Sequence, residues 1–231
     1  MSLKLNISWK KIVKWVVTGL LIILGLVFFI RVATWEDAYY REKEGSERDV
    51  VAVVQEEEEE ELIEIEPTEE EVIEYTVPAD HPRYLTIEKL GIYNARIITV
   101  GVNDSGVLGT PNNIFDVGWY ESSGKPGDGK TMLIDGHNGG PHVHGVFKDL
   151  PELSVGDIIV VERGDGLKYN YSVVENKEVL LSDSDAYMST ALRSPEPGRE
   201  SVTLITCTGE WSQMQRTYLS RQFTRAVLVT Y

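Results

Sequence analysis

The sequence contains a single cysteine, Cys207, and few basic residues for a chain of 231. One thiol excludes a disulfide framework within the chain and every zinc site that needs several thiolates. The formal net charge of −15 argues against a nucleic-acid-binding protein, because phosphate recognition needs a basic surface. The G-x-S-x-G nucleophile elbow and a glycine-rich phosphate loop are also absent. A serine hydrolase and a nucleotide-dependent enzyme therefore have no support.

The acidic residues are concentrated in one part of the chain. Residues 1–35 carry five bases and no acid, whereas residues 36–80 carry 19 acids against three bases. An unbroken run of glutamates covers residues 56–61. Like charges at this density repel one another, so we expect an extended spacer over residues 35–81, some of it helical. An acidic tail that binds a cation or a partner is the alternative.

An apolar run follows the N-terminal bases. No charge interrupts Trp15 to Ile30. Ile12 and Val13, with the Lys14 amine reaching the lipid headgroups, extend the run to about the 20 residues that span a bilayer. Bases before the run and acids after it predict a cytoplasmic segment 1–11, a transmembrane anchor 12–34 and an extracytoplasmic remainder. We thus expect a single-pass type II protein of the cell membrane. A cleaved signal peptide is the alternative, although its best cleavage site, Val32-Ala33-Thr34, is poor.

From residue 82 onward, short β-rich runs alternate with turn signals. Several alternate apolar and polar residues, while 157–161 and 203–206 are apolar enough to be buried on both faces. About eight short strands and few helical stretches predict an all-β fold, a closed eight-stranded β-barrel over residues 82–231. Short helices are expected at 146–150 and near 184–193. The clearest predicted strands are 83–87, 95–100, 131–134, 157–161, 169–180, 201–207 and 226–231.

Cys207 closes the predicted strand 201–207 and precedes the loop signal Thr208-Gly209. A cysteine without a partner in its own chain is an inert buried thiol, an intermolecular link or a nucleophile. A nucleophilic thiol needs a base and a positive group for the oxyanion that forms. His137, which follows an apolar strand, is the candidate base. Three arginines downstream are candidates for the positive group: Arg216, Arg221 and Arg225.

These residues resemble those of the sortases, membrane-anchored cysteine transpeptidases of bacterial surfaces. TLITCTG is similar to the sortase nucleophile motif and places Cys207 at its cysteine. TMLIDGHNGG, followed by GVFKDL, is similar to the Gly-His segment and places His137 at its histidine. TYLSRQFTRAVLV is similar to the last segment and places Arg221 at its arginine, 14 residues after the cysteine. The likeness covers about residues 82–231, and NNIFDVGWY and ERGDG resemble actinobacterial-type sortases of class E or F.

The resemblance implies a sortase-like barrel and a transpeptidase reaction. Cys207 would cleave a C-terminal sorting signal similar to Leu-Pro-x-Thr-Gly through a thioacyl enzyme. His137 would act as acid and base, and Arg221 would stabilise the oxyanion. The implied partners are secreted proteins that carry such a signal and an amine nucleophile from a cell-wall precursor or a pilin, with no nucleic acid. No cofactor or metal is required.

Two features depart from the family or compete with this assignment. Asp135 stands where the family often has alanine or serine, and we expect its carboxylate to raise the pKa of His137. Arg225 rivals Arg221, because strand residues four apart point to the same face. A non-enzymatic surface binding or scaffold module is one alternative function. The other is a zinc-dependent hydrolase that uses Asp135, His137, His142 and His144.

Overall fold

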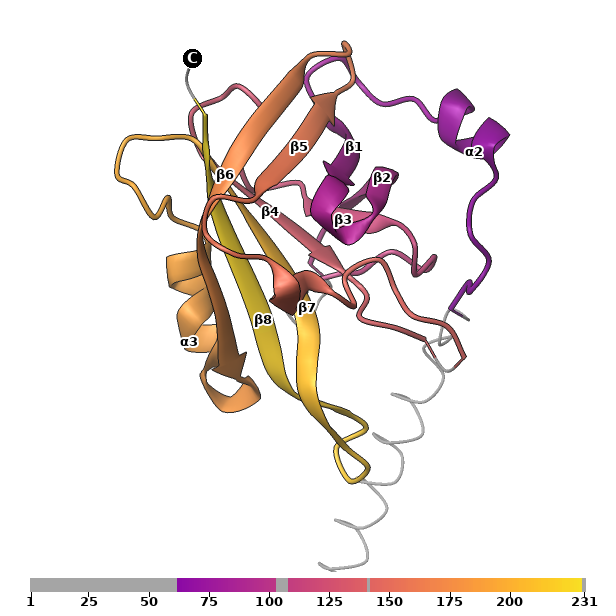
Figure 1. The fold of residues 1–231 in the computed structure, drawn as a ribbon, viewed down its shortest axis with the longest axis vertical. Helices are drawn as coiled ribbons and strands as arrows, with labels where there is room; N and C mark the ends of the chain where they lie inside the picture. The colour runs from indigo at the N-terminus through magenta and orange to yellow at the C-terminus, as the bar shows by residue number, and fades with distance from the viewer. Residues whose placement is uncertain (1–61, 103–107, 141, 230–231) are drawn as a thin grey trace, which may run out of the picture. The chain divides into compact units, whose positions relative to one another are not determined.

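The computed structural model describes residues 62–102, 108–140 and 142–229. Eight strands form the framework (Figure 1): β1 (Pro82–Ile87), β2 (Ile92–Val100), β3 (Val117–Tyr120), β4 (Thr131–Gly136), β5 (Ile158–Arg163), β6 (Lys168–Leu180), β7 (Ser201–Ser212) and β8 (Thr217–Leu228). Two short α-helices, α2 (Glu69–Glu74) and α3 (Leu181–Ala191), and two 3₁₀ turns, η1 (Glu88–Leu90) and η2 (Leu150–Glu152), complete it.

The predicted cytoplasmic segment 1–11 and transmembrane anchor 12–34 lie outside the described residues, as does the spacer up to residue 61. Within the three described ranges, no helix is both long and apolar enough to cross a membrane.

The strands close into a barrel in the order β1-β2-β3-β4-β7-β8-β6-β5. The pairs β2–β3 and β4–β7 are parallel, and the other pairs are antiparallel. Closure pairs every strand on both sides, which removes the exposed edges that promote aggregation. The predicted closed eight-stranded barrel is confirmed, and its sheet is mixed because two of its eight pairs are parallel.

Alternation along β7 separates the barrel interior from its outer face. Val202 and Leu204 belong to the interior core, whereas Ile205 belongs to a second cluster outside it. Residues 203–206 are buried on both faces, as predicted. The same prediction was wrong for 157–161, because Ile158 is 44% exposed on β5 while Ile159 and Val161 are buried. The apolar run there reflects β-propensity on a strand whose outer side chains face solvent.

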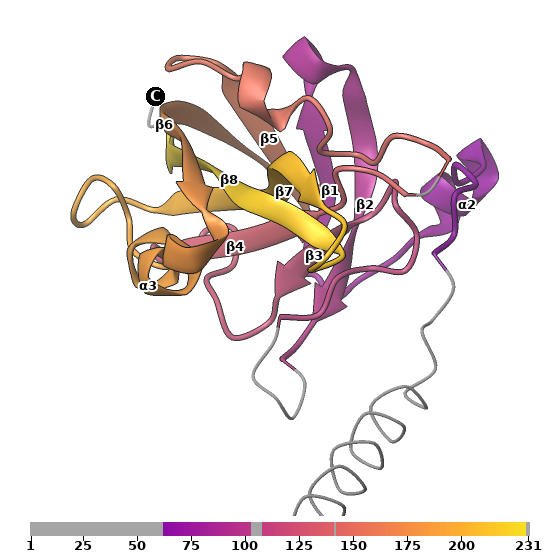
Figure 2. The same cartoon turned by 90° about the horizontal axis from the view of Figure 1, so that it is seen from below.

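Helix α3 covers the outer face of the sheet beside β6 and β8. The cluster beneath it comprises Leu133, Val179, Ala191, Ile205 and Phe223. The helix begins three residues earlier than the predicted 184–193, and Thr203 Oγ1 donates to the Ala191 carbonyl at 2.7 Å where it ends. The expected helix 146–150 is instead a turn that leads into η2. Helices α3 and α2 lie on opposite sides of the barrel (Figures 1 and 2).

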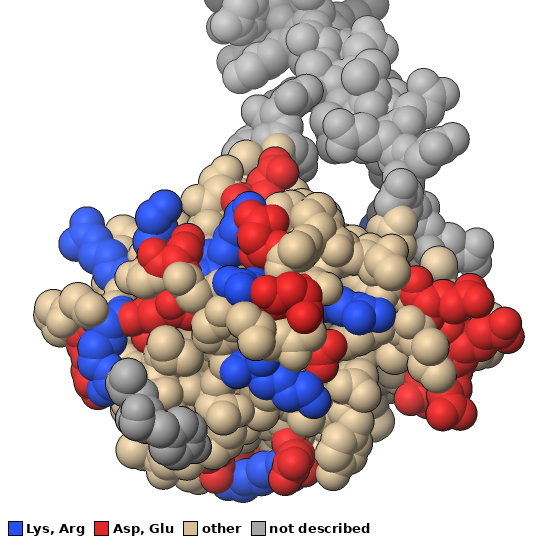
Figure 3. Space-filling model, turned by 90° about the horizontal axis from the view of Figure 1, so that it is seen from above, with Lys and Arg blue, Asp and Glu red and all other residues tan. Residues whose placement is uncertain are grey.

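Residues 62–81, the last part of the predicted spacer, are folded against the barrel. Thr68 caps α2 through a capping box with Glu71, which satisfies amide groups at the helix start. The Tyr75 hydroxyl donates to the Ile97 carbonyl at 2.5 Å, and Arg83 Nε donates to the Tyr75 carbonyl at 2.8 Å. Figure 3 shows acidic side chains gathered on the side of the molecule where α2 lies. The domain boundary at residue 81 stays a prediction. Residues 62–81 are packed on the barrel rather than extended into solvent.

Candidate active site

Cys207 and Arg221 are direct cross-strand partners on β7 and β8. Cys207 does not end its strand, so that part of the sequence prediction was wrong. Thr208-Gly209 forms a bulge rather than a terminus, because Gly209 adopts φ +82° and the ladder resumes at Trp211. The half-buried cysteine therefore lies within a long hairpin, and the β7–β8 ladder continues before and after it along the strand.

Arg221 shares the outer face of the sheet with Cys207. Its Nη1 donates to the carbonyls of Tyr218 and Ser220 at 3.0 and 2.9 Å, and Nη2 donates to Thr217 Oγ1 at 3.4 Å. The guanidinium is thus held along its own strand, and its charge lowers the pKa of the Cys207 thiol. A fixed cation at this place favours a negative charge on the neighbouring sulfur or on a bound oxygen.

His137 follows the last residue of β4 directly, as the sequence predicted. Its Nε2 lies 2.8 Å from the Pro111 carbonyl. Because a carbonyl oxygen only accepts, Nε2 must carry a hydrogen, so in the neutral ring Nδ1 is the nitrogen that can accept a proton. The preceding Gly136 packs under Phe147, and a Cβ there would lie 2.6 Å from the ring. Phe147 also donates its amide to the His137 carbonyl at 2.9 Å, so the Gly-His pair and the later phenylalanine form one packed unit.

Asn138 connects the histidine to the cysteine strand. Its Nδ2 donates to the Cys207 carbonyl at 2.7 Å. The loop that carries His137 is thereby fastened to the backbone of the residue that carries the thiol. Sequence reasoning did not assign a role to Asn138, although its place next to His137 in a glycine-rich loop was a usable signal.

Burial is the largest influence on the pKa values of both candidate groups, Cys207 and His137. Burial raises the pKa of the Cys207 thiol. The Arg221 charge lowers this pKa, and the Asp135 charge raises it further. Burial lowers the pKa of His137, against the hydrogen bond to Pro111, which raises it. Both directions favour the neutral thiol and the neutral imidazole over the ion pair. The prediction that Asp135 raises the pKa of His137 was therefore wrong.

Asp135 acts on the cysteine rather than on the histidine. It is 8% exposed, and its Oδ1 has no hydrogen-bond partner among the described residues. Burial raises its pKa to about 7, against a hydrogen bond from Thr110, which lowers it. Gly118 provides the space for this carboxylate, because a Cβ there would lie 2.3 Å from Oδ1. A buried acid thus shares the outer face with Ile205 and Cys207.

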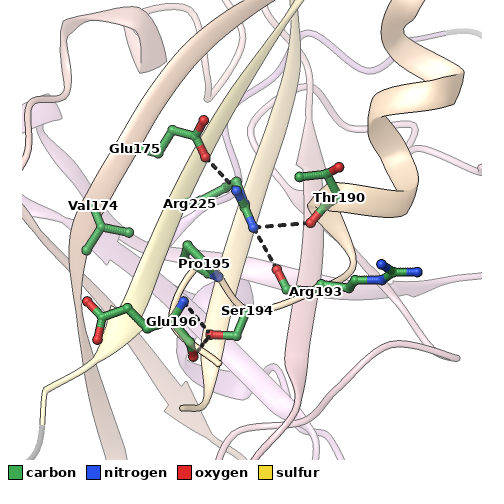
Figure 4. A pocket seen from close by; sticks show the side chains of 8 residues that line it. All are labelled: Val174, Glu175, Thr190, Arg193, Ser194, Pro195, Glu196 and Arg225. Carbon is green, nitrogen blue, oxygen red and sulfur yellow. Dashed lines mark hydrogen bonds and ion pairs between the residues drawn. The ribbon is translucent and has the colours of Figure 1, made fainter. Parts of the chain in front are cut away.

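Arg225 lies four residues beyond Arg221 on the same face, as predicted, and pairs with Thr203 rather than with Cys207. Figure 4 shows its guanidinium directed at Glu175 and at two carbonyl groups near the end of α3. Nη1 lies 2.5 Å from Glu175 Oε2, and Nη2 donates to the Thr190 and Arg193 carbonyls. It borders an open pocket of about 620 Å³ whose lining does not include Cys207. These contacts hold the Arg225 guanidinium against Glu175 and the end of α3, away from the thiol.

The four residues of the alternative zinc site are not assembled for metal binding. In the described ranges, no group of three or more histidine, cysteine, aspartate or glutamate side chains is placed to hold a metal ion. His142 and His144 are exposed in the loop after His137, while Asp135 is buried under residues 110 and 111.

Comparison with known proteins identifies the family. The model of the sortase domain matches residues 85–229, well over half of the chain. Similar solved structures include sortase C1 from Streptococcus agalactiae (24% identity, 71% of this chain and 78% of that chain, TM-score 0.48) and a lid mutant of sortase A from Corynebacterium diphtheriae (23%, 69% and 74%, 0.46). Another is a sortase D5 transpeptidase from Clostridium perfringens (23%, 71% and 90%, 0.46). A search of curated proteins gave no match. The family-model match establishes that this chain belongs to the sortase family of cysteine transpeptidases.

Proposed function

We propose that this sortase cleaves a Leu-Pro-x-Thr-Gly-like signal near the C-terminus of secreted proteins, with Cys207 as nucleophile, His137 as acid and base, and Arg221 as oxyanion stabiliser. The observation that carries the proposal is the cross-strand pair of Cys207 and Arg221, fastened through Asn138 to the loop of His137. The accepting group is an amine from a cell-wall precursor or a pilin.

The first half-reaction forms a thioester. The Cys207 thiolate attacks the carbonyl carbon of the threonine, and the carbonyl electrons move onto oxygen. The Arg221 guanidinium, carried by the strand position opposite Cys207, releases one of its backbone carbonyl partners and donates to this oxyanion instead, which stabilises it. As the tetrahedral intermediate collapses, the C–N bond breaks and the protonated Nδ1 of His137 gives its proton to the departing amine.

The second half-reaction reverses these roles. The incoming amine attacks the thioester carbonyl, and neutral His137 takes the proton that the amine loses. The C–S bond then breaks and the thiolate departs, which restores the enzyme. The raised pKa of Cys207 and the lowered pKa of His137 keep the resting pair mostly neutral, so the reactive ionised form is a minor population at neutral pH.

The apolar part of the signal has a suitable surface next to the thiol. Ile205 lies two residues before Cys207 on the same face and belongs to the same buried apolar cluster as Leu133 of β4. Leu108 and Tyr120 pack against this cluster and remain partly exposed. A bound peptide with its threonine at Cys207 would bury its leucine and proline against Leu108 and Tyr120, the partly exposed side chains of this cluster.

The enzyme would act at the outer surface of the cell membrane. Sortases are membrane-anchored surface enzymes, and the apolar run at 12–34 behind N-terminal bases supports a single-pass type II anchor. The same charge pattern supports a cytoplasmic segment 1–11 and an extracytoplasmic catalytic domain over residues 82–231, with the acidic residues 35–81 between them. The class E or F assignment likewise remains a proposal that rests on short sequence segments.

Trapping of the thioacyl enzyme tests the proposal. The full chain in detergent is incubated with a sorting-signal peptide and no added amine, and intact mass is measured. The wild type should gain the mass of the peptide up to its threonine, and C207A should gain nothing. H137A should turn over at least about 100-fold more slowly. An adduct or full cleavage with C207A would refute the nucleophile, and loss of wild-type activity with a chelator would indicate the zinc hydrolase instead.

A further inference from the structure

The start of the described chain lies against a segment that holds the catalytic histidine. Ile63 forms a parallel bridge with Asn113, in which the Ile63 amide donates to the Asn112 carbonyl at 2.9 Å. The Ile114 amide returns a hydrogen bond to the Ile63 carbonyl at 3.1 Å. This segment directly follows Pro111, whose carbonyl accepts from His137. The acidic N-terminal stretch is therefore paired with the backbone that supports the imidazole.

Glu64 contacts a second segment of the same site. Its Oε1 accepts from the backbone amides of His142 and Val143 at 2.8 and 3.3 Å. The neighbouring Gly140 leaves room for the carboxylate, since a Cβ at that position would lie 2.1 Å from Oε1. One carboxylate thus accepts hydrogen bonds from two backbone amides. Charge-assisted hydrogen bonds of this kind are about twice as strong as neutral ones.

The segment that Glu64 holds is the one that begins with His137 and Asn138. We call residues 137–140 and 142–145 the histidine loop. Its two arms are tied together, because Gly140 donates to the Val143 carbonyl at 2.9 Å and Gly145 donates to the Asn138 carbonyl at 2.8 Å. A displacement at residues 142–143 is therefore transmitted to Asn138, whose side chain reaches the Cys207 carbonyl.

Glu64 itself is held in place from the other side. Asn113 Nδ2 donates to the Ile65 carbonyl at 3.0 Å, and the chain then enters the capped helix α2. The Tyr84 hydroxyl donates to the Val72 carbonyl, and Tyr75 reaches β2. Both ends of the stretch around Glu64 are thus fixed to the barrel, so its carboxylate is a firm support rather than a mobile charge.

We propose that Glu64 is a positioning residue for the transpeptidation reaction: its carboxylate holds the histidine loop so that His137 and Asn138 stay in register with Cys207. This proposal rests on the function proposed above. Glu64 touches no reacting atom, so its loss should slow the chemical steps and leave the binding of the sorting signal nearly unchanged. A glutamine at this position retains an acceptor oxygen and should restore part of the rate.

Kinetics of E64A, E64Q and E70Q in the full chain test the proposal. Glu70 is the matched control, because it is an exposed glutamate of the same acidic stretch whose side chain makes no hydrogen bond or ion pair with the described residues. With a sorting-signal peptide and an amine acceptor, kcat of E64A should fall about 5- to 20-fold with KM within twofold of the wild type. The kcat of E64Q should lie between those of E64A and the wild type, and both kinetic constants of E70Q should match the wild type.

Hydrogen exchange separates this proposal from the function on which it rests. Exchange measured by mass spectrometry in the peptide that covers residues 138–146 should be at least several-fold faster in E64A than in wild type or E70Q. Unchanged exchange, or unchanged kcat in an active enzyme, overturns the positioning role. A rise in KM with constant kcat also overturns it. If the wild type forms no thioacyl enzyme, the proposed function fails, whereas the exchange result still decides whether Glu64 holds the loop.

Discussion

Replacement of Asp135 with asparagine should remove a pH dependence from the stability of the domain. The carboxyl has a pKa of about 7 in the folded protein against an ordinary value of 3.8. Below pH 3.8 it is protonated in both states. As the pH rises, the unfolded chain releases this proton first, so the free energy of unfolding falls between about pH 4 and pH 7 and then levels off.

The size of this effect follows from the two pKa values. At 1.36 kcal/mol per pKa unit, the full displacement is equivalent to roughly 4 kcal/mol, of which about 2–3 kcal/mol is lost between pH 5 and pH 8. Solvent screens this carboxyl little, because the residue is only 8% exposed. D135N should not show this loss. The comparison uses the difference between the two pH values, so an unpaired amide or a packing cost in the variant cancels.

Urea unfolding of the full chain in detergent, followed by tryptophan fluorescence, measures the effect at both pH values. Trp119, which is buried, reports on unfolding of the barrel. The fall in the free energy of unfolding from pH 5 to pH 8 should be about 2–3 kcal/mol larger for the wild type than for D135N. An equal fall in both proteins would refute the argument that burial keeps this carboxyl protonated. D135N should also lower the pKa of the Cys207 thiol, because the Asp135 charge raises it.

The remaining predictions concern the two rival arginines and the Gly-His pair. R221A should slow alkylation of Cys207 by iodoacetamide at pH 7.5, because the Arg221 charge lowers the pKa of the thiol, whereas R225A should leave that rate unchanged. R225A should instead reduce the free energy of unfolding by about 2–3 kcal/mol, since it leaves the partly exposed Glu175 carboxylate and two carbonyl groups without their partner. If R225A slowed alkylation and R221A did not, Arg225 would be the arginine that acts on the thiol. G136A should cost about 1–3 kcal/mol by driving a methyl group into Phe147, and G101A, whose Cβ would meet its nearest atom at 3.5 Å, should cost less in the same unfolding assay.

Much of the barrel was accessible from sequence because its strands follow simple local rules. The runs that contain β4, β6 and β7 combine β-branched residues with alternation and are bounded by glycine, proline and aspartate, so each could be located before any fold was known. Strand β3 is only four residues long and gave no separate signal. The error at residues 157–161 arose because apolar content alone does not report whether a strand's outer face is covered.

The candidate site was predicted in part for a similar reason. Cys207 and His137 stand in short motifs that depend on nearby residues, such as Gly136 and the Phe147 that packs on it. The effect of Asp135 could not be predicted in this way. Asp135 is only two residues from His137 in the sequence. The alternation of its strand and its burial beside residues 110–111 nevertheless place its charge where it acts on Cys207. Through-space electrostatics depends on the fold, not on the spacing along the chain.

By itself, the sequence determined the strand content of the domain, the concentration of acid in residues 36–80 and the identity of the lone cysteine, because these depend on composition and local pattern. Only the tertiary structure decided that Arg221 rather than Arg225 lies across from Cys207, and that Glu64 reaches the histidine loop. Both relations join residues far apart in the chain. They depend on strand register and on how the N-terminal stretch packs, which long-range pairing fixes and local pattern does not.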